Sequence, residues 1–515
     1  MLNIYNYFHK SLKASPNRSC LVIDDKIYTY KEVNDEVCKL SSLLCRMDCS
    51  NLVGIVTYKT FWTYVSILAI LKSGRGYVPI NAKFSAERKQ QIIALSGLNT
   101  VIAGDASGKI LVEIAAESPI NLIFPSVDCI NIDADLQKTK RAAIFTNKDL
   151  YDEHPTDYVA SSDVAYLLFT SGSTGVPKGV AIKHLNVISY IENINKLFDF
   201  EESDRFSQLF ELTFDLSIHD IFVCFSKGAT LCIPPELLSP VSYANKHKIT
   251  VWFSVPSLAS LVTKSVRSEM MNLKTLRHSL FCGEPLPLSV ATKWKAIAPK
   301  SQIHNIYGPT EATIGITIYT CPDQNIKSNF GFVSIGKVFS DQRYTIINDE
   351  LGVQKYNTVG ELCLAGSQVI SRYWTEELSA NKKFLNLDQS DEHLWYRTGD
   401  LVIQDEDNDV FYIARKDFQV KVRGYRVELQ EIDFVIKAFV NHDNVVSVAV
   451  TNDQLITEGI YTFIEGAEIV SKHIIIDHCS TKLAHYMVPE NIIYVNTFPL
   501  NLNGKVDRNA LLDLI

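Results

Sequence analysis

The sequence predicts an α/β chain with a large N-terminal domain of layered sheets and helices and a smaller C-terminal α+β domain. Three observations lead to this prediction: the length of 515 residues, an alternation of helical and strand-like segments, and a charged junction after residue 414. A single hydrophobic core stops growing at about 250–300 residues, so a chain of this length is expected to divide. The 46% of hydrophobic and 21% of charged residues are typical of a globular protein.

The first 100 residues alternate between helical and strand-like patterns. Apolar residues at helical spacing predict a helix within 31–44, namely Val33, Val37, Leu40 and Leu44. The segment 53–59 then predicts a strand, and a later helix is expected to stop at Gly74 and Gly76 before another strand begins. Such alternation is typical of layered α/β proteins with parallel strands.

The domain boundary is predicted where the chain becomes strongly charged. The acidic segment 404–410 separates two strand-like runs, which predicts the tip of a hairpin. The charged cluster at 414–417 follows, and after it a new unit of alternating strands and helices begins. We therefore expect a large domain at 1–414, a junction at 415–417 and a small domain at 418–515.

Composition excludes several broad classes of function. The 50 basic and 58 acidic residues give a net charge of -8, which disfavours an extended nucleic-acid surface. No apolar run approaches the ~18 residues of a membrane helix, and the N-terminus lacks the pattern of a signal peptide, so we expect a cytoplasmic protein without a membrane partner. The 11 cysteines are scattered without the short repeated spacings of a metal site, and buried reduced thiols are expected.

The strongest local pattern is VAYLLFTSGSTGVPKG at 164–179. A strand-like run leads into a loop of glycine, hydroxyl and lysine residues: Thr170, Ser171, Gly172, Ser173, Thr174, Gly175 and Lys178. Glycines let backbone N–H groups face an anion, hydroxyls donate hydrogen bonds and the lysine supplies charge, which predicts a phosphate-binding loop. The spacing differs from the P-loop G-x-x-x-x-G-K-[ST]. A polar surface loop between a strand and a helix is the alternative interpretation.

This loop resembles the signature of the acyl-adenylate-forming superfamily, which contains nonribosomal-peptide adenylation domains, acyl-CoA ligases and luciferases. Further segments, in the same order, are similar to other motifs of that superfamily, so the resemblance covers nearly the whole chain. They are LKSGRGYVPIN at 71–81, FDLSIHDIF at 214–222, NIYGPTEATIG at 305–315, WYRTGDL at 395–401, RKDFQVKVRGYRVELQEID at 415–433 and NLNGKVDRNAL at 501–511. The resemblance implies ATP-dependent activation of a carboxylic acid as an acyl-adenylate, with Mg²⁺.

The resemblance also assigns nucleotide-binding roles. Tyr307 would lie near the adenine, Thr310 would donate to a phosphate and Glu311 would hold Mg²⁺. The Gly308-Pro309 turn between Tyr307 and Thr310 can present all three side chains. Asp400 and Arg415 would bind the ribose. Taken alone, Glu311 could be a solvated loop charge, and Asp400 and Arg415 could form a surface salt bridge.

Two reaction steps and a mobile small domain are further implications. Lys505 would bridge the substrate carboxylate and the α-phosphate, where charge repulsion must be offset as pyrophosphate leaves. The expected catalytic residues are therefore Lys505, Thr170, Thr310 and Glu311. The small domain would then rotate about a hinge at Asp417, and Gly424 would let the backbone approach a pantetheine arm closely. The alternative interpretations are a plain turn glycine at 424 and a solvent-exposed lysine at 505.

The same resemblance indicates the substrate class. Asp215 lies where amino-acid-activating members carry an aspartate for the substrate ammonium, although a structural cap or an internal pair is the alternative. The implied acid pocket comprises Asp215, Leu216, His219, Phe253, Leu280, Cys282, Gly283, Ile306, Ile314 and Gly315. It is mainly apolar and favours a neutral side chain of modest size. His219 would either bind a polar substituent or be a satisfied core histidine. The segments DFQVK and FDLSIHDIF are also similar to D-alanine–carrier ligases.

The expected acceptor is the phosphopantetheine thiol of a separate carrier protein. Only ten residues follow Lys505 in the sequence, so we expect the chain to be a stand-alone amino acid–carrier ligase, of the kind used in nonribosomal peptide synthesis. A local basic patch would dock an acidic carrier, with Lys416, Lys421, Arg423 and Arg426 as candidates. An acyl-CoA ligase that uses free coenzyme A and a non-catalytic nucleotide-binding homologue are the competing interpretations.

Overall fold

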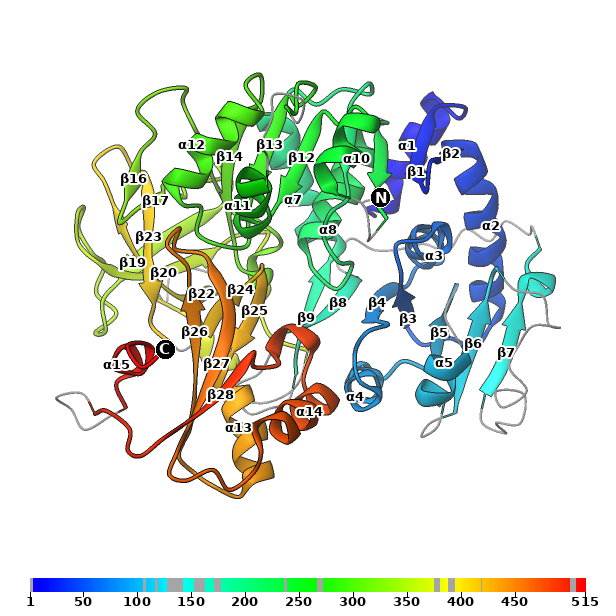
Figure 1. Cartoon of the computed structure of the whole chain (residues 1–515). Helices are drawn as coiled ribbons and strands as arrows, with labels where there is room; N and C mark the ends of the chain where they lie inside the picture. The colour runs from blue at the N-terminus through cyan, green and yellow to red at the C-terminus, as the bar shows by residue number, and fades with distance from the viewer. Residues whose placement is uncertain are drawn as a thin grey trace.

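The computed structural model shows a large body and a smaller one, coloured orange to red in Figure 1, that packs against it. It describes residues 3–104, 108–115, 119–126, 142–151, 163–170, 177–235, 239–265, 272–374, 380–387, 394–417, 419–500 and 506–515. Within these ranges, no helix has both the length and the apolar character needed to cross a bilayer.

Two mainly parallel sheets form most of the large body. One has the order β18-β15-β14-β13-β12-β10-β11-β1-β2. Its strands are β1 (Ser19–Ile23), β2 (Lys26–Thr29), β10 (Arg205–Ser207), β11 (Thr230–Ile233), β12 (Val251–Ser254), β13 (His278–Phe281), β14 (Gln302–Tyr307), β15 (Thr317–Thr320) and β18 (Lys337–Val338). The other has the order β7-β6-β5-β3-β4-β8-β9 and contains β3 (Leu52–Thr57), β4 (Gly76–Asn81), β5 (Thr100–Ile102), β6 (Ile120–Phe124), β7 (Ala142–Thr146), β8 (Val164–Thr170) and β9 (Lys178–Lys183).

Helices cover these sheets. They are α1 (Tyr5–Ala14), α2 (Tyr30–Arg46), α3 (Phe61–Lys72), α4 (Ala86–Ser96), α5 (Gly108–Ala115), α7 (His184–Leu197), α8 (Leu216–Ile218), α9 (Cys224–Lys227), α10 (Pro240–Lys246), α11 (Pro256–Ser265) and α12 (Leu288–Ile297). The helix predicted within 31–44 is α2, and its four periodic residues are fully buried. It begins with a capping box, in which Thr29 and Glu32 satisfy each other's backbone N–H groups.

The predicted α/β alternation is confirmed at β3, α3 and β4. Helix α3 ends before Gly74, whose φ of +81° suits a residue without a side chain, and β4 then pairs with β3 in parallel. A Cβ on Gly76 would lie 2.6 Å from the carbonyl oxygen of Val164. Gly76 therefore allows β4 and β8 to approach closely.

A third, antiparallel sheet completes the large body. It contains β19 (Arg343–Ile347), β20 (Gly360–Ala365), β21 (Phe384–Leu385), β22 (Trp395–Gln404) and β23 (Val410–Arg415), and the small β16 (Ser328–Asn329) and β17 (Phe332–Val333) lie beside β23. The hairpin predicted at 404–410 is confirmed, because β22 and β23 pair antiparallel on either side of it. Its carboxylates surround the Lys327 ammonium at 2.6–2.9 Å.

The small C-terminal domain has α+β structure, as predicted. It contains β24 (Gln419–Val422), β25 (Tyr425–Glu428), α13 (Leu429–Val440), β26 (Val445–Thr451), β27 (Thr457–Glu465), α14 (Lys472–Lys482), β28 (Asn491–Val495) and α15 (Arg508–Leu512). Strands β26, β27 and β28 form its sheet, and α13 packs against β26. A buried ion pair of 3.3 Å joins Arg88 of α4 to Glu431 of α13, so the two bodies are in direct contact.

Candidate active site

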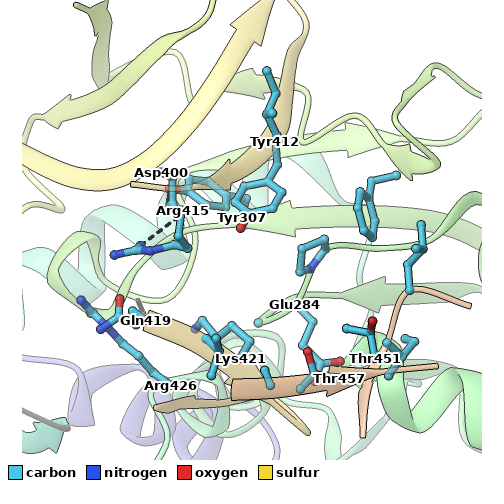
Figure 2. Close-up of a pocket in the computed structure, with 18 of the residues that line it drawn as sticks. Glu284, Tyr307, Asp400, Tyr412, Arg415, Gln419, Lys421, Arg426, Thr451 and Thr457 are labelled. Carbon is cyan, nitrogen blue, oxygen red and sulfur yellow. Dashed lines mark hydrogen bonds and ion pairs between the residues drawn. The ribbon is translucent and has the colours of Figure 1, made fainter. Parts of the chain in front are cut away.

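A cavity of about 470 Å³ lies between the large body and the small domain, and Figure 2 shows its walls. The large body contributes Tyr307, Asp400 and Arg415, whereas Gln419, Lys421 and Arg426 come from the hairpin β24–β25. A second cavity of about 60 Å³ adjoins it, and its lining includes Thr170, Asp215, Gly308, Thr310 and Lys421. The hairpin therefore enters the cleft where most of the predicted site residues meet.

Asp400 is the centre of a hydrogen-bonded group on the large-body wall. The Tyr307 hydroxyl donates to it at 2.5 Å, and Arg415 Nη1 donates at 2.8 Å. Arg415 lies directly opposite Asp400 in the β22–β23 ladder, and its Nε and Nη2 also donate to Asp417 at 2.8 and 2.7 Å. Burial lowers the pKa of Arg415, but Asp400 and Asp417 reverse this and raise it above its ordinary value. The predicted ribose-binding pair is thus assembled, and the predicted hinge residue belongs to the same group.

Glu311 lies on a short 3₁₀ turn, Thr310–Ala312, and is 1% exposed. Its two carboxylate oxygens accept hydrogen bonds from Arg426 Nη1 at 3.0 and 2.8 Å, and the Tyr373 hydroxyl donates to it at 2.6 Å. Burial would raise the pKa of Glu311, but Arg426 and Tyr373 lower it to about 2. An ionised hard carboxylate suits Mg²⁺ as a ligand. In this arrangement, however, both oxygens are bound by protein donors.

Asp215 is a second buried carboxylate, 6% exposed, at the wall of the smaller cavity. It accepts the backbone N–H of Ile314 at 3.2 Å, and Ile314 adopts a left-handed φ of +73°. Burial raises the pKa of Asp215, and Lys421 opposes this rise. The pKa of Lys421 is lowered by burial and by Arg426, and the attraction of Asp215 partly offsets the fall. Asp215 and Lys421 therefore influence each other across the cavity.

The predicted phosphate loop is only partly described. Thr170 ends β8 and Lys178 begins β9, and these two residues are register partners in an antiparallel pair. The loop therefore connects two strands, which corrects the alternative in which it joined a strand to a helix. Thr170 reaches the smaller cavity together with Thr310. The loop residues Ser171, Gly172, Ser173, Thr174 and Gly175 lie outside the described residues, as does Lys505.

The predicted acid pocket is assembled next to Asp215, but its side chains are almost completely covered. Leu216 is 4% exposed, Cys282, Ile306 and Ile314 are 1% exposed, and His219, Phe253 and Leu280 are 0% exposed. His219 Nδ1 lies 2.7 Å from the Tyr190 hydroxyl, and burial lowers the pKa of His219 to about 3. His219 is thus a neutral core histidine with a partner at one ring nitrogen.

Gly424 forms the turn of the hairpin β24–β25. Its φ is +85°, and a Cβ there would overlap the Val255 side chain. Its backbone N–H donates to the Glu284 carboxylate at 2.5 Å, and Glu284 also accepts from the Ser257 backbone N–H at 2.8 Å. Glycine is therefore required here by backbone conformation and by close approach.

The proposed basic docking patch is wrong in part. Lys421 lines the cavities, and the Arg426 side chain is 12% exposed and bound to Glu311, so neither can meet a partner at the surface. Arg423 and Lys416 remain, with side chains 64% and 39% exposed. The physical reason is the hairpin register, which places Lys421 opposite Arg426 on the face that enters the cleft.

Comparison with known proteins identifies the family of this chain. A family model described as AMP-binding enzyme matches residues 8–374, more than half of the chain. The chain belongs to this family. It is therefore an adenylating, AMP-forming ligase by superfamily, and ATP is the substrate that the family implies.

Individual relatives place this AMP-binding enzyme among adenylation domains. It is 28% identical to bacitracin synthase 1 of Bacillus licheniformis over 519 residues, which is 99% of this chain but 9% of that protein. It is 29% identical to the anguibactin system regulator of Vibrio anguillarum and covers 47% of its length. The chain thus spans only a part of these curated relatives.

A solved structure is similar along its whole length. The crystal structure of the Vibrio cholerae adenylation domain AlmE in complex with glycyl-adenosine-5'-phosphate is 27% identical, with a TM-score of 0.91, and the match covers 100% of this chain and 98% of that one. IdnL7 is also 27% identical, with a TM-score of 0.73 and the same coverage. These full-length matches confirm the predicted fold with its large and small parts.

The sequence did not predict the contacts of several residues in the site. Lys421 and Arg426 were expected at the surface, and Glu284, Tyr373 and Tyr190 were not singled out. A signal existed for the first two, because a two-strand hairpin around Arg423-Gly424 places residues 421 and 426 opposite each other. The remaining three contact the site from distant segments, and no local pattern marks them.

Proposed function

We propose that the enzyme activates an amino acid as an aminoacyl-adenylate and then transfers it to the phosphopantetheine thiol of a separate carrier protein. The observation that carries this proposal is the position of Asp215, a buried carboxylate at a cavity that adjoins the cleft between the two bodies. A buried carboxylate requires a compensating cation. A substrate ammonium would provide one at the point where its carboxylate faces the phosphate-binding residues.

The first step would join the acid to the nucleotide. The substrate carboxylate attacks the α-phosphorus of ATP and pyrophosphate leaves. Tyr307 would contact the adenine, and Asp400 and Arg415 would bind the ribose. The phosphates would be held by Thr170, Thr310, Lys178 and the loop 171–175. Lys505 would hold the substrate carboxylate and the α-phosphate together. Mg²⁺, when bound at Glu311, would neutralise phosphate charge.

The second step would require the small domain in a different orientation. We propose the boundaries 1–414 and 418–515, with rotation about 415–417. The thiol then attacks the acyl carbon and AMP leaves. The described orientation suits this second step, because Gly424 approaches Val255 and the cavity extends between the two bodies. A crosslink that fixes the hinge should leave pyrophosphate release intact and abolish thioester formation, whereas survival of both would contradict two orientations.

The relatives support amino-acid activation. AlmE, which resembles this chain over its full length, was crystallised with an aminoacyl-adenylate, and bacitracin synthase 1 contains a segment 28% identical to it. An acyl-CoA ligase is the alternative, and it differs in the acceptor. A comparison of holo-carrier protein with coenzyme A as acceptors of the same adenylate distinguishes the carrier-protein ligase from the acyl-CoA ligase.

ATP–pyrophosphate exchange across the amino acids tests the proposal directly. Exchange with one or a few amino acids is the expected result. Lys505→Ala should strongly reduce exchange while nucleotide binding persists. Exchange that does not respond to any amino acid would refute amino-acid activation and favour a different acid or a non-catalytic homologue.

A further inference from the structure

Beyond Leu216, the acid pocket next to Asp215 contains no open space for a substrate side chain. Leu216, which lines the smaller cavity, is 4% exposed, and His219, Phe253 and Leu280 are 0% exposed. A cavity that admits even one water molecule would leave part of its lining accessible. The pocket is therefore filled by its own side chains.

Aromatic rings fill it from several elements. The His219 ring lies 4.5 Å from the Phe253 ring, which in turn lies 4.9 Å from Phe210. Tyr190 reaches in from α7 and its hydroxyl bonds to His219 at 2.7 Å. Protein interiors packed in this way do not accept added atoms without displacing their neighbours.

The orientation of the small domain does not cause this closure. The rings of Tyr190, Phe210, His219 and Phe253 contact one another, and all belong to the large body. Gly315 lies directly against the Ile306 side chain, which a Cβ on Gly315 would overlap. Rotation of the small domain would withdraw Lys421 from Asp215 but would leave these contacts unchanged.

The free space at Asp215 is small as well. The adjoining cavity has a volume of about 60 Å³, and its lining includes Asp215 and Leu216 of the large body and Lys421 and Gly424 of the small domain. The acid pocket beyond this cavity is closed by its own side chains, so a substrate held at Asp215 has no pocket for atoms beyond its α-carbon. We infer that the amino acid activated by this enzyme is glycine, an assignment that rests on the proposed function.

The test is ATP–pyrophosphate exchange with glycine, L-alanine, D-alanine, L-serine and L-leucine. We expect kcat/KM for glycine to exceed that for either alanine at least ten-fold, and exchange with leucine to be undetectable. Any larger amino acid that exchanges as fast as glycine would overturn the inference while leaving amino-acid activation intact. Absence of exchange with every amino acid would instead overturn the proposed function, and the inference with it.

A pocket variant examines the cause of the preference. Phe253→Ala should create space beside His219 and reduce the preference for glycine over alanine at least ten-fold. Its matched control is Phe281→Ala on the next strand, β13, because Phe281 is equally buried but packs on Trp294, in a different core cluster. The control should keep the wild-type preference. If Phe253→Ala does not fold, Leu280→Ala, at the register partner of Phe253, provides the same test. An unchanged preference in the folded pocket variant would refute closure as its cause.

Discussion

Replacing Arg426 by methionine removes the small-domain cation that binds Glu311 while keeping an unbranched side chain. In the structure, Nη1 of Arg426 contacts both carboxylate oxygens, at 3.0 and 2.8 Å. Glu311 is 1% exposed and the Arg426 side chain 12%, so water screens the pair very little. Because Glu311 belongs to the large body, the pair stabilises this orientation of the two bodies specifically.

The structure gives the magnitude. Burial raises the pKa of Glu311, yet Arg426 and Tyr373 bring it from its ordinary 4.5 down to about 2. Removing one partner of a buried ion pair costs about 3–5 kcal/mol, and we take about 3 kcal/mol because Tyr373 continues to donate to Glu311 after the replacement. Since the folded-state pKa is depressed, this stabilisation is present above pH 4.5 and disappears as the pH falls toward 2. At pH 7 it is complete.

Two half-reactions measured separately provide the assay. Arg426→Met should slow transfer of the adenylate to the carrier thiol about 100-fold, because about 3 kcal/mol corresponds to roughly two powers of ten. Pyrophosphate exchange should change by no more than a few-fold. Arg423→Met is the matched control, since Arg423 lies on the same hairpin, is 64% exposed and pairs with Glu490 at the surface. Equal losses in both half-reactions, or no loss in either, would refute the reasoning.

The remaining predictions concern three other positions. Asp215→Asn removes the charge that would pair with the substrate ammonium, so amino-acid-dependent exchange should fall at least 100-fold. The affinity for ATP, measured by calorimetry, should stay within two-fold of the wild-type value. Retained exchange would contradict the substrate role. Asp400→Asn should raise the KM for ATP about ten-fold, the effect of losing ~1.4 kcal/mol, and an unchanged KM would exclude ribose binding there. Gly424→Ala should block thioester formation but not pyrophosphate exchange, because the alanine Cβ would overlap Val255 at a φ of +85°. A second substitution, Val255→Ala, should partly restore transfer. Normal transfer by Gly424→Ala alone would contradict a functional role for the close approach of residue 424 to Val255.

The fold could be predicted where local periodicity decides the structure. The helical spacing from Val33 to Leu44 corresponds to the buried face of α2, and the glycines after α3 correspond to the start of β4. The hairpin at 404–410 followed from turn-forming acidic residues between two apolar runs. Each of these signals is contained in ten to fifteen neighbouring residues, which is the range over which propensity and pattern act.

The contacts of the site could be predicted only in part, because they join distant segments. The motifs assigned Tyr307, Asp400 and Arg415 to the same ligand, and Asp400 does contact both of the others. The partner of Glu311 could not be found in this way, since Arg426 reaches it only through the packing of one domain on the other. The closure of the acid pocket was equally hidden, because the bulk of Tyr190 comes from a helix outside every motif.

The hairpin β24–β25 explains how two buried carboxylates of the cleft, Asp215 and Glu311, can remain charged without substrate. Lys421 faces Asp215 and Arg426 binds Glu311, so one small-domain element supplies both compensating cations. Buried carboxylates are costly unless a cation accompanies them, and this holds in every orientation of the hairpin. If the hairpin withdraws, other cations must replace its own, and the substrate ammonium and a metal ion are the two that the proposed reaction supplies. In the described orientation, Lys421 and Arg426 therefore compensate the charges of Asp215 and Glu311. In the substrate-loaded orientation, the substrate ammonium and the metal ion would compensate the same two charges.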